Sequence, residues 1–150
     1  MNAVRVRALV AADADAARPL VTTQFAGTPY FDWIMEQLNG VLAQSDPERE
    51  GLVAVSGTDA RVIGLVLFGA VAGATGVARI HALVGDAPAA LRALIAATLG
   101  DARMSVCELA DDAPHRAAAD ALLARGFVEE GRVADFFRDG VALRLLTRMG

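Results

Sequence analysis

Two side chains of this sequence have the chemistry of a general base or acid near neutral pH. His81 carries an imidazole, whose ordinary pKa of about 6.5 suits a base. Glu108, in the strand predicted to follow, is the best-placed carboxylate. Each also has a structural interpretation, because a strand histidine is often simply hydrogen-bonded and a charge at a strand edge is often solvated. Both are candidate catalytic residues.

The remaining reactive residues are few. Tyr30 is the only tyrosine and stands in an aromatic group with Phe31 and Trp33, which either lines a pocket or packs a helix. The lone Cys107 cannot form an internal disulfide, which favours a reduced, cytoplasmic protein. The sequence has no spacing typical of a metal site, no Ser–His–Asp arrangement and no nucleotide phosphate loop. It therefore predicts no metal cofactor.

Length and composition set broad limits. The 150 residues suit a single domain over 1–150. Apolar residues make up 55% of the chain but aromatic residues only 5%, because much of the apolar share is alanine. All basic side chains are arginine, a bias typical of a bacterial coding sequence. The net charge of −4 argues against nucleic acid and anionic membrane surfaces as partners.

The uncharged stretch from Val62 to Ala78 raises the question of a membrane span. It is at the lower length limit for a spanning helix. Four glycines interrupt it, so two strands joined by a glycine-rich turn explain it better. The N-terminus lacks the apolar region of a signal peptide. No membrane partner is expected.

Hydrophobic periodicity and capping residues predict an alternating order of elements. Strands are predicted over Val4–Val10, Leu52–Val55, Arg61–Ala70, Val77–Val84, Met104–Leu109, Phe127–Phe137 and Val141–Thr147. Helices are predicted from Asp13 or Asp15 to about Thr23, from Pro29 to about Gln44, over Pro88–Leu99, and from Asp111 or Asp112 to Arg125. The strand–helix–strand step around Pro88–Leu99 should be parallel and right-handed, and the other pairings antiparallel.

The C-terminal part resembles a known family. Residues 122–130 read Leu-Leu-Ala-Arg-Gly-Phe-Val-Glu-Glu, and residues 135–141 read Asp-Phe-Phe-Arg-Asp-Gly-Val. Together with the element order, these resemble the GNAT superfamily of acyl-CoA-dependent N-acetyltransferases over almost the whole chain. The resemblance implies an α/β (α+β) three-layer fold, with one mixed twisted sheet of 6–7 strands and about four helices. It also implies acetyl transfer to a small-molecule or peptide amine, and homodimers are common among such proteins.

In that family acetyl-CoA binds where the fourth and fifth strands separate, with its pyrophosphate on backbone amides that open the next helix. Tyr30 lies in a region that commonly shapes the amine site. The matching cofactor positions here are Leu83, Val84, Gly85, Ala87, Ala89 and Ala90.

The resemblance fails at specific positions. The connection after Gly85 is short, Asp86 stands where the family has a basic or amide side chain, and Pro88 has no amide to donate. Asp86 is better explained as a helix N-cap. Leu122 replaces the tyrosine that protonates the leaving thiolate, and His115 is expected at the surface.

Two functions are compatible with these residues. In the first, the chain is an N-acetyltransferase that holds acetyl-CoA in an altered way, with His81 in the strand that lines the cleft. Strand alternation predicts that Arg79, His81 and Leu83 share one face. In the second, the chain keeps the scaffold, has lost ordinary acetyl-CoA binding and serves as a ligand-binding or protein-interaction module.

Overall fold

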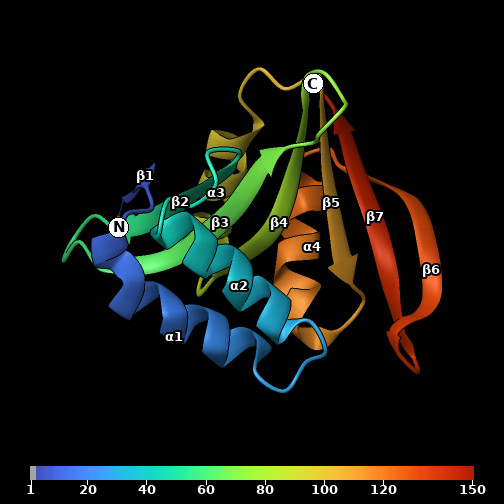
Figure 1. Ribbon diagram of the computed structural model, residues 1–150, viewed down its shortest axis with the longest axis horizontal. Helices are drawn as coiled ribbons and strands as arrows, with labels where there is room; N and C mark the ends of the chain where they lie inside the picture. Colours follow the sequence, from blue (N-terminus) through green and yellow to red (C-terminus); the bar gives the residue numbers. More distant parts are fainter. Residues whose placement is uncertain (1–2) are drawn as a thin grey trace.

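The computed structural model describes residues 3–150 and shows one seven-stranded sheet between two pairs of helices (Figure 1). The strand order is β1-β2-β3-β4-β5-β7-β6, and only the β4–β5 pair is parallel. The strands are β1 (Val4–Ala8), β2 (Arg49–Ser56), β3 (Val62–Ala70), β4 (Val77–Gly85), β5 (Met104–Ala110), β6 (Val128–Arg138) and β7 (Val141–Met149). The helices are α1 (Ala14–Phe25), α2 (Phe31–Leu42), α3 (Pro88–Leu99) and α4 (Arg116–Ala124), with short 3-10 turns η1 (Ala11–Asp13) and η2 (Ala113–His115). The predicted fold class is confirmed.

Local chemistry explains the best-defined boundaries. Pro88 begins α3, where its missing amide is not needed, and Gly100, which has a positive φ, follows the helix. After α4, Gly126 adopts a φ of +96°, and the amide of Phe127 turns back to donate to the carbonyl of Leu122. The uncharged stretch is the β3–β4 hairpin, as predicted. Within residues 3–150, no helix is long and apolar enough to cross a membrane.

Several element starts differ from the prediction. The helix expected from Pro29 begins at Phe31, because the Thr28 hydroxyl donates back to the Phe25 carbonyl instead of capping α2. Asp13 does not cap α1; its carboxylate pairs with Arg7 and accepts the Val10 amide, which closes η1.

Strand β2 begins at Arg49, before the expected apolar run, because pairing with β3 extends the ladder to that residue. Strand β1 ends at Ala8 and does not reach Val10.

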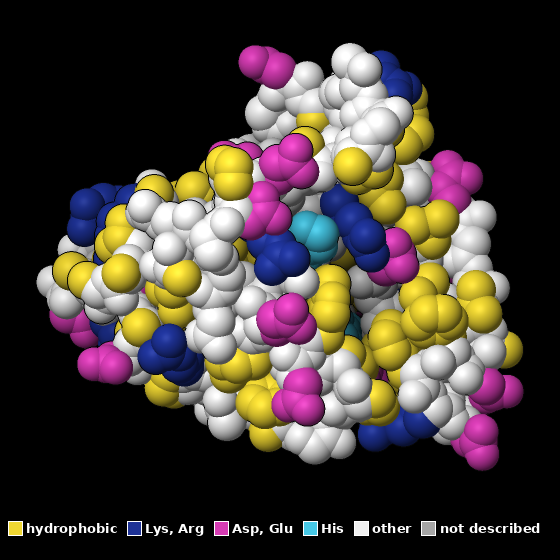
Figure 2. All heavy atoms as spheres, in the orientation of Figure 1, with side chains coloured by type: hydrophobic (Ala, Val, Ile, Leu, Met, Phe, Trp, Pro, Cys, Tyr) yellow, Lys and Arg dark blue, Asp and Glu magenta, His cyan; other side chains and the backbone are white. Residues whose placement is uncertain are grey.

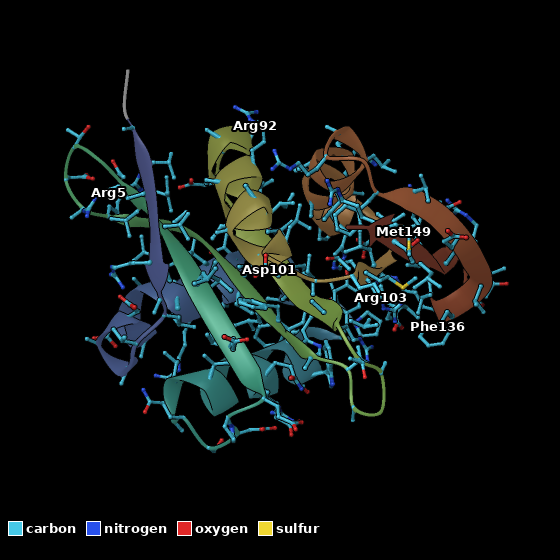
Figure 3. All side chains as sticks on the ribbon, turned by 90° about the horizontal axis from the view of Figure 1, so that it is seen from above. Arg5, Arg92, Asp101, Arg103, Phe136 and Met149 are labelled. Carbon is cyan, nitrogen blue, oxygen red and sulfur yellow. The ribbon has the colours of Figure 1, made fainter. Side chains whose placement is uncertain are left out.

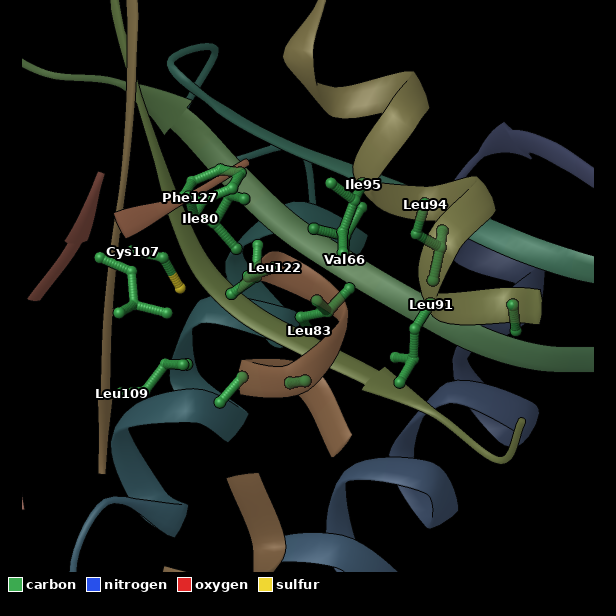
Figure 4. Packing of buried hydrophobic residues seen from close by; sticks show 14 of the residues in the cluster. Val66, Ile80, Leu83, Leu91, Leu94, Ile95, Cys107, Leu109, Leu122 and Phe127 are labelled. Atoms are coloured by element: carbon green, nitrogen blue, oxygen red, sulfur yellow. The ribbon is translucent and has the colours of Figure 1, made fainter. Parts of the chain in front are cut away.

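Each face of the sheet has its own hydrophobic core. On one face, α3 and α4 cover a cluster that includes Ile80, Leu83, Leu122 and Phe127 (Figure 4). On the other face, α1 and α2 cover a second cluster built around Phe25, Leu38 and Leu65, among others. The central strands of the sheet are thus covered on both sides, whereas the edge strand β6 is exposed along most of its length.

Candidate active site

Strands β4 and β5 pair over only four residues. The parallel pairs run from Val77 with Met104 to Ile80 with Cys107, and the strands then diverge (Figure 1). Beyond that point β4 continues to Gly85 along β3 alone, while β5 continues along β7. The divergence leaves facing backbone edges without a partner strand, a place where polar chemistry can be positioned.

A β-bulge in β4 sits at this divergence and corrects the predicted alternation. In the β3–β4 ladder Leu67 pairs with Ala82 and Phe68 with Ile80, so His81 is the extra residue. Ile80 and Leu83 therefore both face α3 and α4, whereas Ala82 faces α1 and α2. The prediction that His81 and Leu83 share a face is wrong, because a bulge shifts the alternation by one residue. Bulges of this kind are over-represented next to active sites.

A cavity of about 430 Å³ opens beside the bulge, within the size range of small-molecule sites. Its floor carries Arg79 and His81 from β4 and Glu108 from β5. Aromatic side chains from the start of α2 and from the β6–β7 hairpin form its walls. The lining residues are Pro29, Tyr30, Trp33, Ile34, Arg79, Ile80, His81, Glu108, Ala110, His115, Phe136, Phe137 and Leu143. Figure 2 shows this face, with a histidine between arginine side chains beside a hollow bordered by hydrophobic side chains.

The two candidate catalytic residues both lie in this cavity, together with an arginine that the sequence analysis assigned no role. A guanidinium nitrogen of Arg79 lies 2.9 Å from a carboxylate oxygen of Glu108. Their side chains are 39% and 36% exposed. An ion pair this exposed contributes about 0–1 kcal/mol, so a ligand can replace it at little cost.

His81 is held in its neutral form. Burial, and then the positive charges of Arg79 and Arg49, lower its pKa to about 4. Its Nδ1 is buried and has no hydrogen-bond partner within residues 3–150, and its ring meets Trp33 edge to face at 5.8 Å between centroids. At neutral pH His81 can accept a proton, but the low pKa makes it a weaker base than an ordinary histidine.

A buried polar cluster closes one end of the cavity. The Tyr30 hydroxyl donates to the carboxylate of Asp112 and lies 3.2 Å from His115 Nδ1, which is 3.0 Å from the other Asp112 oxygen. Burial, and then Asp112, raise the pKa of Tyr30, so the phenol keeps its proton. Burial lowers the pKa of His115 although Asp112 opposes the effect. Tyr30 therefore serves as a cavity wall and is a poor proton donor.

The expectation that His115 lies at the surface is wrong. Asp112 caps η2 by accepting the His115 amide, and this turn brings the imidazole back onto Tyr30 and Phe25. The Asp-x-x-His spacing was the available signal, because a cap and the residue three positions later share one turn. Phe136 and Phe137 were likewise missed as cavity walls, since their position in a hairpin gave no indication of what they face.

The connection from β4 to α3 is only two residues long, Asp86 and Ala87. The Asp86 amide donates to the Ile63 carbonyl, and the amides of Ala90 and Leu91 donate to the Ala87 carbonyl. The prediction that Asp86 caps α3 is wrong: Ala87 occupies the cap position, and no side chain caps the helix. With Pro88 first in α3, few amides remain to bind an anion there.

Comparisons with known proteins identify the fold. No family model matches the sequence, and no curated protein matches it. A GNAT-family protein of Desulfovibrio desulfuricans superposes with a TM-score of 0.79 at 19% identity, covering 98% of this chain and 99% of that one. The chain has the GNAT fold.

Other GNAT-fold structures have equally complete overlap. Ribosomal-protein-alanine N-acetyltransferase of Brucella melitensis has a TM-score of 0.74 at 13% identity, covering 97% of this chain and 99% of its own. Spermidine N-acetyltransferase of Vibrio cholerae, in a complex with CoA and spermine, has a TM-score of 0.72 at 18% identity, covering 97% and 95%.

The residues that GNAT resemblance implies for acetyl-CoA can now be located. Leu83, Val84 and Ala90 are buried, Gly85 and Ala87 are half-buried, and Ala89 is exposed. A pantetheine arm would pair with the free edge of β4, but Leu83 is 2% and Val84 1% exposed, which leaves almost no accessible edge.

The end of α1 contacts η2 next to this region, since Gln24 lines the same hollow as Val84 and Gly85. The Gln24 side-chain amide donates to the Pro114 carbonyl at 2.6 Å, and Phe25 packs on His115 with ring centroids 5.0 Å apart. The hollow beside the β4–α3 connection is lined by two carboxylates, Asp15 and Asp86, and by one guanidinium, Arg61, so its net charge does not attract a pyrophosphate. As folded here, these residues do not fit acetyl-CoA.

Gly85 has a packing reason of its own. A Cβ at this position would lie 2.9 Å from Cδ2 of Leu91, so the glycine allows α3 to pack closely on β4. Its presence is therefore no sign of a phosphate site. No group of His, Cys, Asp and Glu that could hold a metal occurs within residues 3–150.

Proposed function

We propose that this chain is a GNAT-fold N-acetyltransferase acting on the amine of a small molecule or peptide. The observation that carries the proposal is the cavity that opens at the separation of β4 and β5, beside the bulge at His81. GNAT-fold proteins similar to it include spermidine and ribosomal-protein-alanine N-acetyltransferases, which act on amines.

The floor of the cavity supplies the groups that an amine needs. The Glu108 carboxylate attracts the ammonium form, and the neutral imidazole of His81, which lines the cavity, can accept its proton before the amine reacts. Tyr30 lines the cavity and is assigned here to the wall of the substrate site. Acetyl-CoA is the donor that the fold implies, and its binding would require Gln24 and Phe25 to leave the β4 edge.

A second candidate function is binding without transfer. It is favoured by two observations: the β4 edge is covered, and Asp86 stands at the start of α3, where a pyrophosphate would bind. In this case the chain is a ligand-binding module that uses the same cavity and has no acyl donor site.

A titration with acetyl-CoA separates the two functions. The enzyme requires binding, measured by calorimetry or thermal shift at moderate salt, and acetylation of at least one amine in a panel. Absence of binding at millimolar acetyl-CoA would overturn the enzyme and leave the binding module. If acetyl-CoA binds at the start of α3, Asp86→Asn tightens it, because one like charge is removed.

The matched control is Asp101→Asn, since Asp101 is an exposed carboxylate at the opposite end of α3 (Figure 3). It removes the same charge and should leave the affinity unchanged. Equal effects of the two substitutions would show that the donor does not bind at the β4–α3 connection.

The cytoplasmic location and the homodimer stay predictions. The edge strand β6 is the surface through which a dimer of this kind would form, and it is exposed along most of its length. Size-exclusion chromatography with light scattering tests the oligomeric state.

A further inference from the structure

The cavity floor presents two opposite charges side by side. Arg79 and Glu108 are 2.9 Å apart, partly exposed, and both line the cavity. A ligand with one charge can satisfy only one of them. An amine that takes Glu108 leaves the guanidinium without its partner, and a carboxylate that takes Arg79 faces Glu108 at short range.

The remaining charges near the cavity do not favour a polycation. Glu108 is the only carboxylate among its lining residues, taken within residues 3–150. Asp112 is occupied by Tyr30 and His115, and the positive charge of Arg138 acts on Tyr30. A polyamine would therefore bring several cations to one carboxylate that already has a partner.

The walls are apolar and aromatic. Trp33 and Phe136 are exposed beside the cavity, while Phe137 packs against Tyr30 with ring centroids 5.1 Å apart. Such walls accept a flat apolar group, and their ring faces also attract a nearby ammonium.

We propose that the cavity binds a free α-amino acid with an apolar, preferably aromatic, side chain. Its carboxylate pairs with Arg79, its ammonium pairs with Glu108, and its side chain lies between Trp33 and Phe136. Since the two protein charges are adjacent, a ligand whose ammonium and carboxylate are attached to one carbon can meet both at once. The inference rests on the proposed function in taking this cavity as the amine site.

The experiment is a calorimetric titration of the full chain without any acyl-CoA. The ligands are phenylalanine, phenethylamine, 3-phenylpropionate and spermidine, so that each charge of the amino acid is removed in turn. Phenylalanine should bind at least about tenfold more tightly than the other three, because each loses a charge-assisted hydrogen bond or adds unpaired cations.

Two variants test which protein charge pairs with the carboxylate of the ligand and which with its ammonium. Arg79→Gln should abolish the preference for phenylalanine over phenethylamine. Glu108→Gln should abolish the preference for phenylalanine over 3-phenylpropionate. Arg92→Gln and Glu36→Gln are the matched controls, because both residues are exposed and outside the cavity; Figure 3 places Arg92 on α3, far from Phe136. Thermal denaturation of each variant verifies that it is folded.

Phenethylamine binding as tightly as phenylalanine would overturn the proposal, as would tighter binding of spermidine or no binding of phenylalanine at millimolar concentration. Effects of the two controls as large as those of Arg79→Gln and Glu108→Gln would overturn it as well. Phenylalanine binding without acetyl transfer would support this proposal and count against the enzyme. Acetylation of amines that lack a carboxylate, at equal efficiency, would support the enzyme and overturn the amino-acid specificity.

Discussion

Replacing Asp112 by alanine tests whether the buried polar cluster holds the closed end of the cavity together. The Asp112 side chain is 6% exposed, accepts the Tyr30 hydroxyl, pairs with His115 Nδ1 at 3.0 Å and caps η2 through the His115 amide. Asp112→Ala removes all of these contacts at once, whereas its neighbour Asp111 offers the same chemical change at the surface.

The expected loss follows from these contacts. Removing an N-cap costs about 0.5–2 kcal/mol, and losing a hydrogen bond to a charged group costs about 1.5–3 kcal/mol. Tyr30 and His115 recover part of this, since they lie 3.2 Å apart and can bond to each other. The free energy of unfolding should therefore fall by about 3 kcal/mol, which for a domain of this size lowers Tm by roughly 6–12 °C.

Urea unfolding at neutral pH, followed by circular dichroism, measures this loss. The control is Asp111→Ala, whose side chain is 48% exposed and pairs with Arg132 at the surface, so that its cost should be about 0–1 kcal/mol. A loss in Asp112→Ala within 1 kcal/mol of the control would refute the reasoning.

The same variant has a second readout in the pKa of His115, measured by NMR. Burial lowers this pKa and Asp112 raises it, so Asp112→Ala should lower it further. Because the folded pKa lies below that of the unfolded chain, His115 reduces stability as the pH falls through about 6.5. The variant should lose stability more steeply in that range, and an unchanged His115 pKa would contradict the assigned contact.

Three further predictions concern β4 and its surroundings. Gly85→Ala should destabilise by about 1–3 kcal/mol, because its Cβ would meet Leu91, while Gly131→Ala in open space should be neutral or stabilising in the same urea assay. Arg79→Gln should raise the pKa of His81 above about 4, because the charge of Arg79 is the second cause, next to burial, that lowers this pKa. NMR titration measures the pKa of His81 directly, and an unchanged value would contradict the prediction. The contribution of His81 to the free energy of unfolding should be constant above pH 6.5. It should fall as the pH drops from 6.5 toward 4, because the unfolded chain binds the His81 proton at a higher pH than the folded chain does. His81→Gln should make this fall less steep.

Proline and glycine predicted both ends of α3, although Pro29 did not mark the start of α2. Helix α3 begins and ends at the predicted residues, Pro88 and Leu99, because Pro88 and Gly100 fix both termini. The bulge at His81 was not predictable, because the strand has no glycine or proline there and the extra residue exists only in relation to β3. Register is a property of a pair of strands, so it cannot be read from the sequence of one strand alone.

The candidate site was predicted only in part, because several of its contacts join residues that lie far apart in the sequence. His81 and Glu108 were chosen for their chemistry, and the structure brings both into one cavity. Arg79 was read only as a strand residue, because its partner lies in another strand. The helix was expected to open at Asp111 or Asp112, and Asp112 caps the turn η2 that precedes it, but its second partner, Tyr30, is 82 positions away in the chain.

The covered β4 edge has an energetic consequence for any acyl donor. An opening that moves the end of α1 away would break the Gln24–Pro114 hydrogen bond, worth about 1 kcal/mol net, and would expose Phe25, which is now fully buried, at up to about 1.5–3 kcal/mol. A total of about 3 kcal/mol means that the open state is populated at roughly one part in 150, and the apparent affinity of the donor falls by the same factor. The amine cavity requires no such opening, because its floor and walls are already in place. Binding of amine and donor should therefore be separable in this chain, with the cavity filled at ligand concentrations where the donor site is still closed.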